Sequence, residues 1–215
     1  DFDLNKKIDK KNLNVIVSKS GNTLETITNS NILINKTSSN IFITENKKSY
    51  LLSLAKKLHD KVIYHNKYIG GRYSVLSEVG MLPAELMGLN TKKFRRLSYL
   101  SKNKKFLNSL VVNVSNIISL MNKGKFNSVI LNYDTDSSEL FYWYQQLVAE
   151  SLGKKGKGIL PIISNMPKDN HSLMQLYLDG RKNNFYTFFY VKDDYTRKIH
   201  NNKILSSHSY LKNKK

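Results

Sequence analysis

Short apolar runs that alternate with longer amphipathic segments place this chain in the α/β class. The runs have the length of strands, whereas the segments between them repeat apolar residues at the spacing of an α-helix. Strands are predicted at Leu13–Val17, Ile41–Thr44, Lys61–His65, Ser128–Asn132, Gly158–Ile163 and Phe185–Val191. Helices are predicted at Thr23–Asn35, Lys48–Asp60, Ser74–Gly88, Leu107–Lys123, Ser137–Gly153 and His171–Gly180. Strands that each lead into a helix predict doubly wound parallel sheets sandwiched by helices.

The order of these elements predicts two α/β units, residues 1–66 and 107–215, joined by a helical linker over residues 67–106. The first unit opens almost directly on a strand, and periodicity is weak from residue 193 onward. We therefore expect the first unit to be incomplete and the second to be truncated at its C-terminal end. Pro83 lies inside the helical pattern of the linker, where it predicts a kink or a break.

The composition limits the kinds of site and compartment. The 215 residues include no Cys, so neither disulfides nor thiolate metal ligands are expected, and the five His show no metal-ligand spacing. The sequence contains no run of about 18 apolar residues and no signal-peptide pattern. We expect a cytoplasmic protein with no metal site and no membrane partner.

The formal net charge of +19 suggests nucleic acid as a partner. However, only five of the 35 basic residues are Arg, and the Lys residues are scattered along the chain. Specific recognition of nucleic acid prefers Arg forks and aromatic stacking surfaces. We therefore do not expect a nucleic-acid partner, and we expect the excess charge to attract a small anionic substrate.

A hydroxyl-rich loop follows the first predicted strand and opens a helix. Its polar residues and its glycine are Ser18, Lys19, Ser20, Gly21, Thr23 and Thr26. A helix N-terminus has unpaired N–H groups and a partial positive charge, so it binds phosphate readily. The same residues would also suit an ordinary N-cap with a capping box, so both interpretations stay open.

Gly70, Gly71 and Arg72 follow the third predicted strand. Paired glycines let the backbone turn tightly, and the space beyond the carboxyl end of a strand is where open α/β sheets bind ligands. This arrangement predicts a fixed positive charge at a binding site. A solvated Arg in a strand-to-helix turn would give the same sequence.

Two segments of the second unit carry acid–base side chains. Gln146 and Glu150 lie four residues apart and share a helix face. Apolar neighbours can raise the pKa of a carboxylate, which would suit Glu150 to take up a proton near neutral pH. His171 is predicted at a helix start, where the helix dipole favours neutral imidazole and hence acid–base work. A solvated Glu and a capping or surface His are the simpler alternatives.

Four segments together resemble the glucose-6-phosphate isomerase family. They are SKSGNTLET at 18–26, GGRYSVLSEVG at 70–80, WYQQLVAESLGKKGKG at 143–158 and DNHSLMQLYLDG at 169–180. They occur in the order of the family and span most of the chain. The resemblance implies two sugar-isomerase (SIS) units. It also implies interconversion of glucose 6-phosphate and fructose 6-phosphate through a cis-enediolate, without metal or organic cofactor.

The resemblance also implies roles for individual residues. For catalysis, Arg72 would stabilise the enediolate, Glu150 would shuttle the proton between C2 and C1, and His171 would assist ring opening. The residues implied to bind the sugar phosphate are Ser18, Lys19, Ser20 and Thr23, with Thr26 beside them, together with Gly71 and Gln146.

The chain also departs from the family pattern. An earlier glycine-rich segment with a phosphate-binding Ser and a C-terminal helix with a catalytic Lys have no counterpart here. Members of the family are homodimers in which the His at the position of His171 comes from the neighbouring subunit. We therefore expect the chain alone to be poorly active, and the alternative function is a non-catalytic SIS module that binds a phosphosugar.

Overall fold

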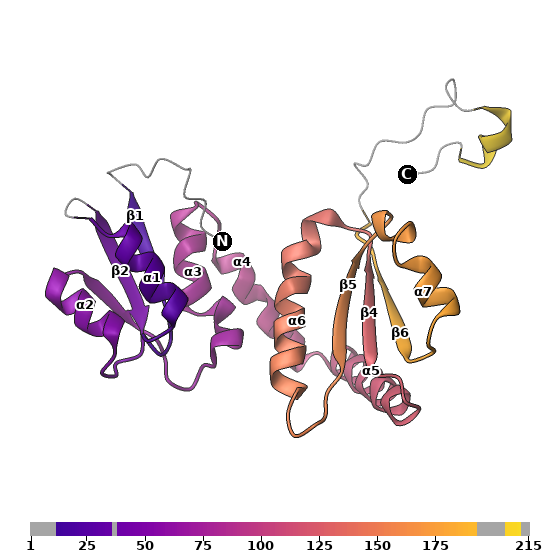
Figure 1. The fold of residues 1–215 in the computed structure, drawn as a ribbon, viewed down its shortest axis with the longest axis horizontal. Coiled ribbons are helices and arrows are strands. Elements are labelled where there is room, and N and C mark those ends of the chain that lie inside the picture. The colour runs from indigo at the N-terminus through magenta and orange to yellow at the C-terminus, as the bar shows by residue number, and fades with distance from the viewer. Residues whose placement is uncertain (1–11, 36–37, 193–204, 212–215) are drawn as a thin grey trace. The chain divides into compact units, whose positions relative to one another are not determined.

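The computed structural model describes residues 12–35, 38–192 and 205–211, and these form two compact α/β units (Figure 1). Unit 1 is Asp1–Ser115 and unit 2 is Asn116–Lys215. The division falls inside helix α5 (Lys104–Asn122). The finer division predicted from the sequence, with boundaries after residues 66 and 106, stays a prediction.

Unit 1 contains a three-stranded parallel sheet in the order β1 (Leu13–Val17), β2 (Ser39–Thr44) and β3 (Lys61–Tyr64). Helix α1 (Leu24–Leu33) connects the first two strands, and α2 (Tyr50–Leu58) connects the second and third. Because the strands lie in chain order and such crossovers are right-handed, α1 and α2 cover the same face of the sheet.

The core of unit 1 forms between that face and the two helices. Phe42 on the central strand has no exposed surface and packs with Ile16, Leu51 and Ala55. Ile27 of α1 and Val62 of β3 pack against this cluster. Apolar residues at alternate strand positions thus meet apolar residues at helical spacing.

A run of short helices follows β3. The elements are the 3-10 helix η1 (Gly71–Leu76), α3 (Glu78–Leu86), α4 (Lys92–Arg95) and the 3-10 helix η2 (Arg96–Lys102). The single helix predicted over Ser74–Gly88 is therefore wrong at its start. The α-helix begins at Glu78 instead. Ser77 is its N-cap, because the Ser77 hydroxyl accepts a hydrogen bond from the Val79 N–H at 3.3 Å. The break predicted at Pro83 is also wrong, since α3 runs through Pro83 to Leu86.

Unit 2 contains a parallel sheet in the order β5 (Leu160–Asn165), β4 (Asn127–Asn132) and β6 (Asn184–Phe189). Helix α6 (Ser138–Leu152) connects β4 to β5, and α7 (Met174–Asp179) lies between β5 and β6. From β4 the chain passes to β5 on one side of it, and from β5 it crosses to β6 on the other side of β4. Right-handed crossovers in opposite directions place α6 and α7 on opposite faces, which is the doubly wound arrangement.

Packing in unit 2 agrees with this topology. Val129 and Leu131 on β4 form a cluster with Tyr177 of α7. Phe141 of α6 instead makes an edge-to-face contact with Phe189, whose ring centroid lies 4.8 Å away. The α/β class, the parallel pairing and all six predicted strands are confirmed, with ends displaced by up to two residues. In the described part of the chain, every helix is too short or too polar to cross a bilayer.

Candidate functional site

The three strands of unit 1 end at one edge of the sheet, and the loops that follow them are tied together there. The Ser18 N–H donates to the Ile43 carbonyl at 3.1 Å, and the Glu45 N–H donates to the Lys19 carbonyl at 3.1 Å. The His65 N–H donates to the Thr44 carbonyl at 2.9 Å. The sheet pairing thus continues into the loops, at the edge where open α/β sheets bind ligands.

The first of these loops presents hydroxyl groups at the start of α1. The buried Ser18 hydroxyl lies 2.8 Å from the Thr23 hydroxyl and accepts the Gly21 N–H at 3.2 Å. Ser20 is exposed, and its hydroxyl accepts the Asn22 N–H. Thr23 occupies the N-cap position of α1 but makes no side-chain capping bond. The alternative of an ordinary N-cap with a capping box is therefore wrong as regards Thr23, and the arrangement is compatible with an anion at this helix start.

Gly21 gives this loop its close packing. Its φ of +64° lies in the left-handed region. A Cβ placed on it would come 2.3 Å from the Ser49 hydroxyl oxygen and 2.9 Å from that of Thr44. Its carbonyl also accepts the Leu51 N–H at 3.0 Å. Only glycine fits here, because the loop backbone lies directly against the start of α2.

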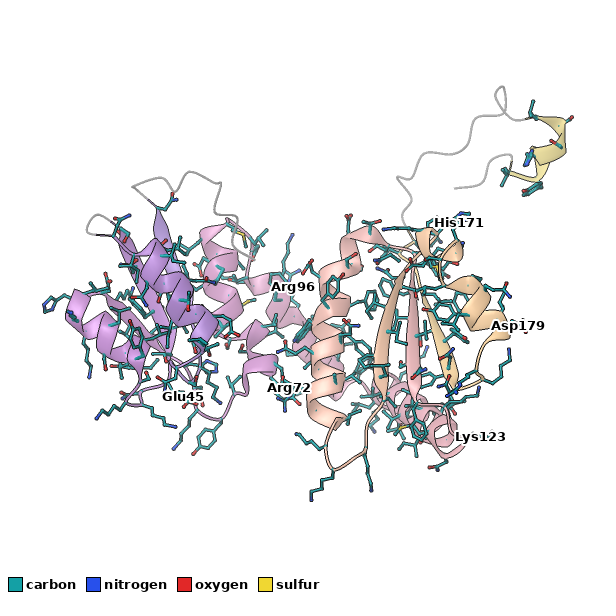
Figure 2. The ribbon with its side chains drawn as sticks, viewed as in Figure 1. Glu45, Arg72, Arg96, Lys123, His171 and Asp179 are labelled. Carbon is teal, nitrogen blue, oxygen red and sulfur yellow. The ribbon has the colours of Figure 1, made fainter. Side chains whose placement is uncertain are left out.

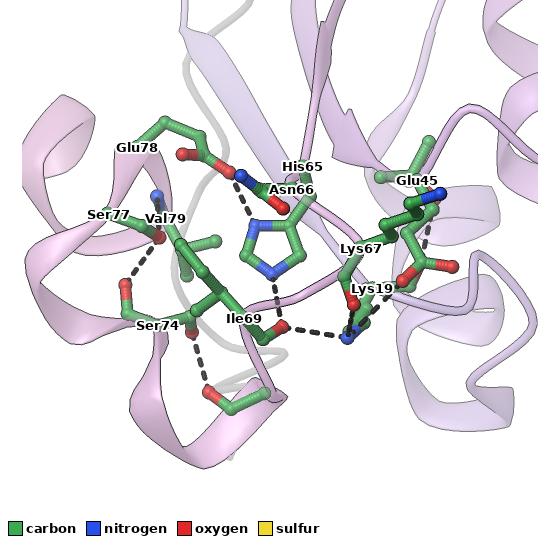
Figure 3. A network of polar contacts seen from close by, with 12 residues as sticks. Lys19, Glu45, His65, Asn66, Lys67, Ile69, Ser74, Ser77, Glu78 and Val79 are labelled. Carbon is green, nitrogen blue, oxygen red and sulfur yellow. Dashed lines mark hydrogen bonds and ion pairs between the residues drawn. The ribbon is translucent and has the colours of Figure 1, made fainter.

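Lys19 connects this loop to the segment that follows β3 (Figure 3). Its ammonium donates to the carbonyls of Lys67 at 3.0 Å and Ile69 at 2.7 Å. It also lies 3.3 Å from a carboxylate oxygen of Glu45. In this structure the ammonium predicted to bind phosphate therefore holds two neighbouring loops together.

The chain turns tightly at Gly70 and Gly71, as predicted: the Tyr73 N–H donates to the Gly70 carbonyl at 2.9 Å and the 3-10 helix η1 begins at Gly71, without a left-handed residue. Gly70 has a φ of −67°, and Gly71 is not among the described glycines with positive φ. The backbone conformation is thus open to other residues, and a Cβ on Gly71 would meet nothing within 4 Å. Gly71 therefore leaves the space next to Arg72 without a side chain of its own. The Arg72 guanidinium is half-buried and lies 5.0 Å from the centre of the Tyr73 ring.

In unit 2, Gln146 and Glu150 share one face of α6 as predicted. The Gln146 amide nitrogen lies 3.4 Å from a Glu150 carboxylate oxygen. Gln146 also lines a pocket of about 400 Å³ with Tyr142, Gln145, Ala149, Leu160 and Pro161. Both Gln146 and Glu150 are exposed, so unit 2 does not bury the Glu150 carboxylate.

His171 is not at a helix start. It follows a 3-10 turn, Lys168–Asn170, and α7 begins only at Met174. The electrostatic argument from a helix N-terminus therefore does not apply. His171 is exposed at the edge of unit 2, as Figure 2 shows.

Glu150 and His171 lie at opposite ends of unit 2. Glu150 is in the last turn of α6, which leads to the amino end of β5, whereas His171 comes after the carboxyl end of β5. A strand of six residues separates the two ends by about 20 Å. One unit 2 therefore cannot bring both side chains to the same substrate.

Residues that sequence reasoning missed include Glu45, His65 and Glu78. Glu45 and His65 are each the first residue after a parallel strand, and this position was the available signal. Glu78 on α3 pairs with His65, and no sequence spacing indicates that contact. Among the residues with described positions, no group of three or more His, Asp and Glu could hold a metal ion.

Sequence similarity relates the chain to proteins named glucose-6-phosphate isomerase. The protein of that name from Methanocaldococcus jannaschii is 36% identical over 198 residues, which are 87% of this chain and 49% of the relative. A probable glucose-6-phosphate isomerase from Methanococcus maripaludis is 33% identical over 201 residues, 85% of this chain and 44% of the relative. The Bacillus anthracis protein is 35% identical over 133 residues, 57% and 28% of the two chains. The chain spans about half the length of the first two relatives.

Solved structures share the fold. A hypothetical protein from Thermus thermophilus has a TM-score of 0.74 at 25% identity, over 93% of this chain and 52% of that protein. A glucosamine-6-phosphate deaminase from Thermotoga maritima has a TM-score of 0.55 at 18% identity, over 85% and 54% of the two chains, and this likeness shows the fold alone. No protein-family model matches the chain.

The geometry at Gly21 predicts a marked loss of stability for Gly21→Ala. The left-handed conformation costs a residue with a Cβ about 1–2 kcal/mol, and the overlap with Ser49 should add roughly 1–3 kcal/mol. Gly88→Ala is the matched control, because Gly88 has a φ of +78° and open space around it. Urea unfolding monitored by circular dichroism measures both; equal losses for the two variants would contradict the role of close packing.

Proposed function

We propose that this chain, a homologue of the glucose-6-phosphate isomerases, is part of an enzyme that interconverts glucose 6-phosphate and fructose 6-phosphate. The similarity to relatives named for this reaction carries the proposal. The hydroxyl-rich loop at the start of α1 and the adjacent Arg72 segment support it. Because the chain spans about half of those relatives, activity is to be measured on the complete gene product that contains it.

The phosphate group is proposed to bind at the start of α1. Its ligands would be the hydroxyls of Ser18, Ser20 and Thr23, with Lys19 in the same loop and Thr26 beside it. The N–H groups of the first helical turn add a partial positive charge that favours a dianion. Phosphate binding far from the reacting carbons supplies energy that orients them.

Glu150 is the proposed base. Its carboxylate would take the proton from C2 of the open-chain aldose, so that the C–H electrons form the C1=C2 bond and the electrons of the C1=O bond move onto O1, which gives a cis-enediolate. The hydroxyl proton of O2 would pass to O1, and the same carboxylate would return its proton to C1 as the C2=O bond forms, which gives the ketose. Arg72 would stabilise the negative charge that develops on oxygen, because a fixed cation is most effective where charge forms in the transition state.

Gly71 and Gln146 would contact the sugar, and His171 would transfer a proton during ring opening. No metal or organic cofactor is needed for this proton transfer. Since His171 and Glu150 lie at opposite ends of unit 2, we propose a homodimer in which each site takes its His171 from the partner subunit. A cytoplasmic location would give the enzyme access to its sugar phosphates.

Glu150→Gln should lower isomerisation and C2 proton exchange with solvent by about 10²–10⁴-fold, because general base catalysis contributes that much. Conversion of fructose 6-phosphate in a coupled assay and deuterium incorporation by NMR measure the two rates. Glu139→Gln on the first turn of the same helix is the control. Exchange that persists in Glu150→Gln would assign the base to another residue, and sugar-phosphate binding without turnover by the unaltered protein would support a non-catalytic SIS module.

Arg72→Ala should reduce kcat by about 10²–10³-fold with little change in KM, since the lost contact acts mainly on the transition state. Arg181→Ala is a suitable control, because Arg181 is exposed in unit 2. A rise in KM at unchanged kcat would instead make Arg72 a simple binding residue.

Subunit complementation tests the shared site. Mixing inactive Glu150→Gln and His171→Ala chains should restore roughly a quarter of the unaltered activity, because half of the dimers are mixed and one of their two sites is complete. The isomerase activity of each variant measured alone gives the background rate. Mixed dimers, verified by differently tagged chains, that stay inactive would show that both residues act from one chain.

A further inference from the structure

His65 is a buried ionisable side chain that the proposed chemistry does not use. It is the first residue after β3, and its side chain is only 1% exposed. A buried imidazole needs hydrogen-bond partners, because burying an unpaired polar group is costly. The identity of its partners therefore indicates what the residue does.

Both ring nitrogens of His65 face hydrogen-bond acceptors. Nδ1 contacts a carboxylate oxygen of Glu78 on α3, and Nε2 lies 3.0 Å from the carbonyl oxygen of Ile69. The Ile69 carbonyl can only accept, so Nε2 carries the hydrogen of that bond, while Nδ1 and the Glu78 carboxyl group share the hydrogen of the other. The imidazole thus bridges the start of α3 and the loop after β3.

The Ile69 carbonyl receives a second donor from another loop. The Lys19 ammonium lies 2.7 Å from it and also bonds the Lys67 carbonyl, as Figure 3 shows. Glu45, which follows β2, holds the same ammonium at 3.3 Å. Side chains that follow β1 and β3 therefore meet at one carbonyl, which directly precedes Gly70, Gly71 and Arg72, and Glu45 after β2 holds one of these two side chains.

The two residues after this carbonyl, Gly70 and Gly71, have no side chains that could hold them in place, and their φ angles are outside the left-handed region. The bonds that do hold them come from the 3-10 turn, in which the Ser74 hydroxyl donates to the Gly71 carbonyl at 2.6 Å. Ile69 is the last residue before Gly70, the N-cap of this turn, so the chain enters the turn from Ile69.

We infer that His65 is a positioning residue that holds the Ile69 carbonyl and thereby sets the place of Arg72. The inference rests on the proposed function, in which Arg72 must lie where oxyanion charge develops. A displacement of about 1 Å in such a group can lower turnover by about 10²-fold while substrate still binds. His65 touches no substrate in this arrangement and acts through the backbone of residues 69–71.

The test compares His65→Phe and His65→Gln in the complete gene product. Phenylalanine fills the space but cannot donate to Ile69, so kcat should fall about 10- to 100-fold with KM changed less than about threefold. The glutamine amide can still donate to the Ile69 carbonyl, so His65→Gln should recover part of that loss. His59→Asn is the control, because His59 is exposed and has a φ of 58°, which Asn tolerates.

Hydrogen exchange and thermal melting separate positioning from general instability. In His65→Phe the amides of residues 66–73 should exchange faster, while exchange in the rest of unit 1 and the melting temperature change little. Unchanged kcat, or faster exchange throughout unit 1, would overturn the inference. If His65→Phe does not fold, Glu78→Ala takes its place. The Glu78 side chain is 28% exposed, and its loss also releases the His65 ring. The same faster exchange at residues 66–73 and the same fall in kcat are expected, and their absence would overturn the inference.

The same data distinguish the inference from the proposed function. If the unaltered protein has no isomerase activity, the proposed function fails, and local exchange at residues 66–73 still decides whether His65 holds the loop. If the unaltered protein is active and His65→Phe keeps its kcat, the function stands and the positioning role fails.

Discussion

The parallel pairing of β1, β2 and β3 is the constraint on which the rest of unit 1 depends. Parallel strands end at the same edge, so residues 20 or 26 positions apart in sequence, such as Thr44 with Tyr64 and Val17 with Ile43, become neighbours. The pairing continues past the strands, because the loop residues exchange backbone hydrogen bonds with one another. The first βα loop and the segment that leads to Arg72 are thereby held on a common support.

The hydrogen bonds between these loops explain why polar side chains gather at the carboxyl edge of the unit 1 sheet. Ser18 and Thr23 satisfy each other, and Lys19 and His65 both donate to the Ile69 carbonyl. Side chains already fixed in this way lose little conformational freedom when a ligand binds, which is the physical content of preorganisation. In unit 2, by contrast, Gln146, Glu150 and His171 are exposed on its surface and divided between its two ends.

The errors of prediction have specific physical causes. The α-helix predicted from Ser74 starts at Glu78, because a 3-10 turn forms first and the Ser77 hydroxyl caps the helix after it. Helical periodicity does not distinguish these two kinds of turn over a single turn of chain. His171 was placed at a helix start for the same reason, while α7 begins three residues later.

The α/β class, all six strands and the candidate residues can be predicted from the amino-acid sequence, because apolar spacing and loop composition are local properties. The hydroxyl-rich loop is likewise located by its position between a strand and a helix. Which of these side chains meet depends on the three-dimensional fold. The convergence of Lys19 and His65 on the Ile69 carbonyl follows from the parallel strand order, the contact of His65 with Glu78 from the path of the chain after β3, and the separation of Glu150 from His171 from their places at the two ends of β5; local sequence spacing encodes none of these.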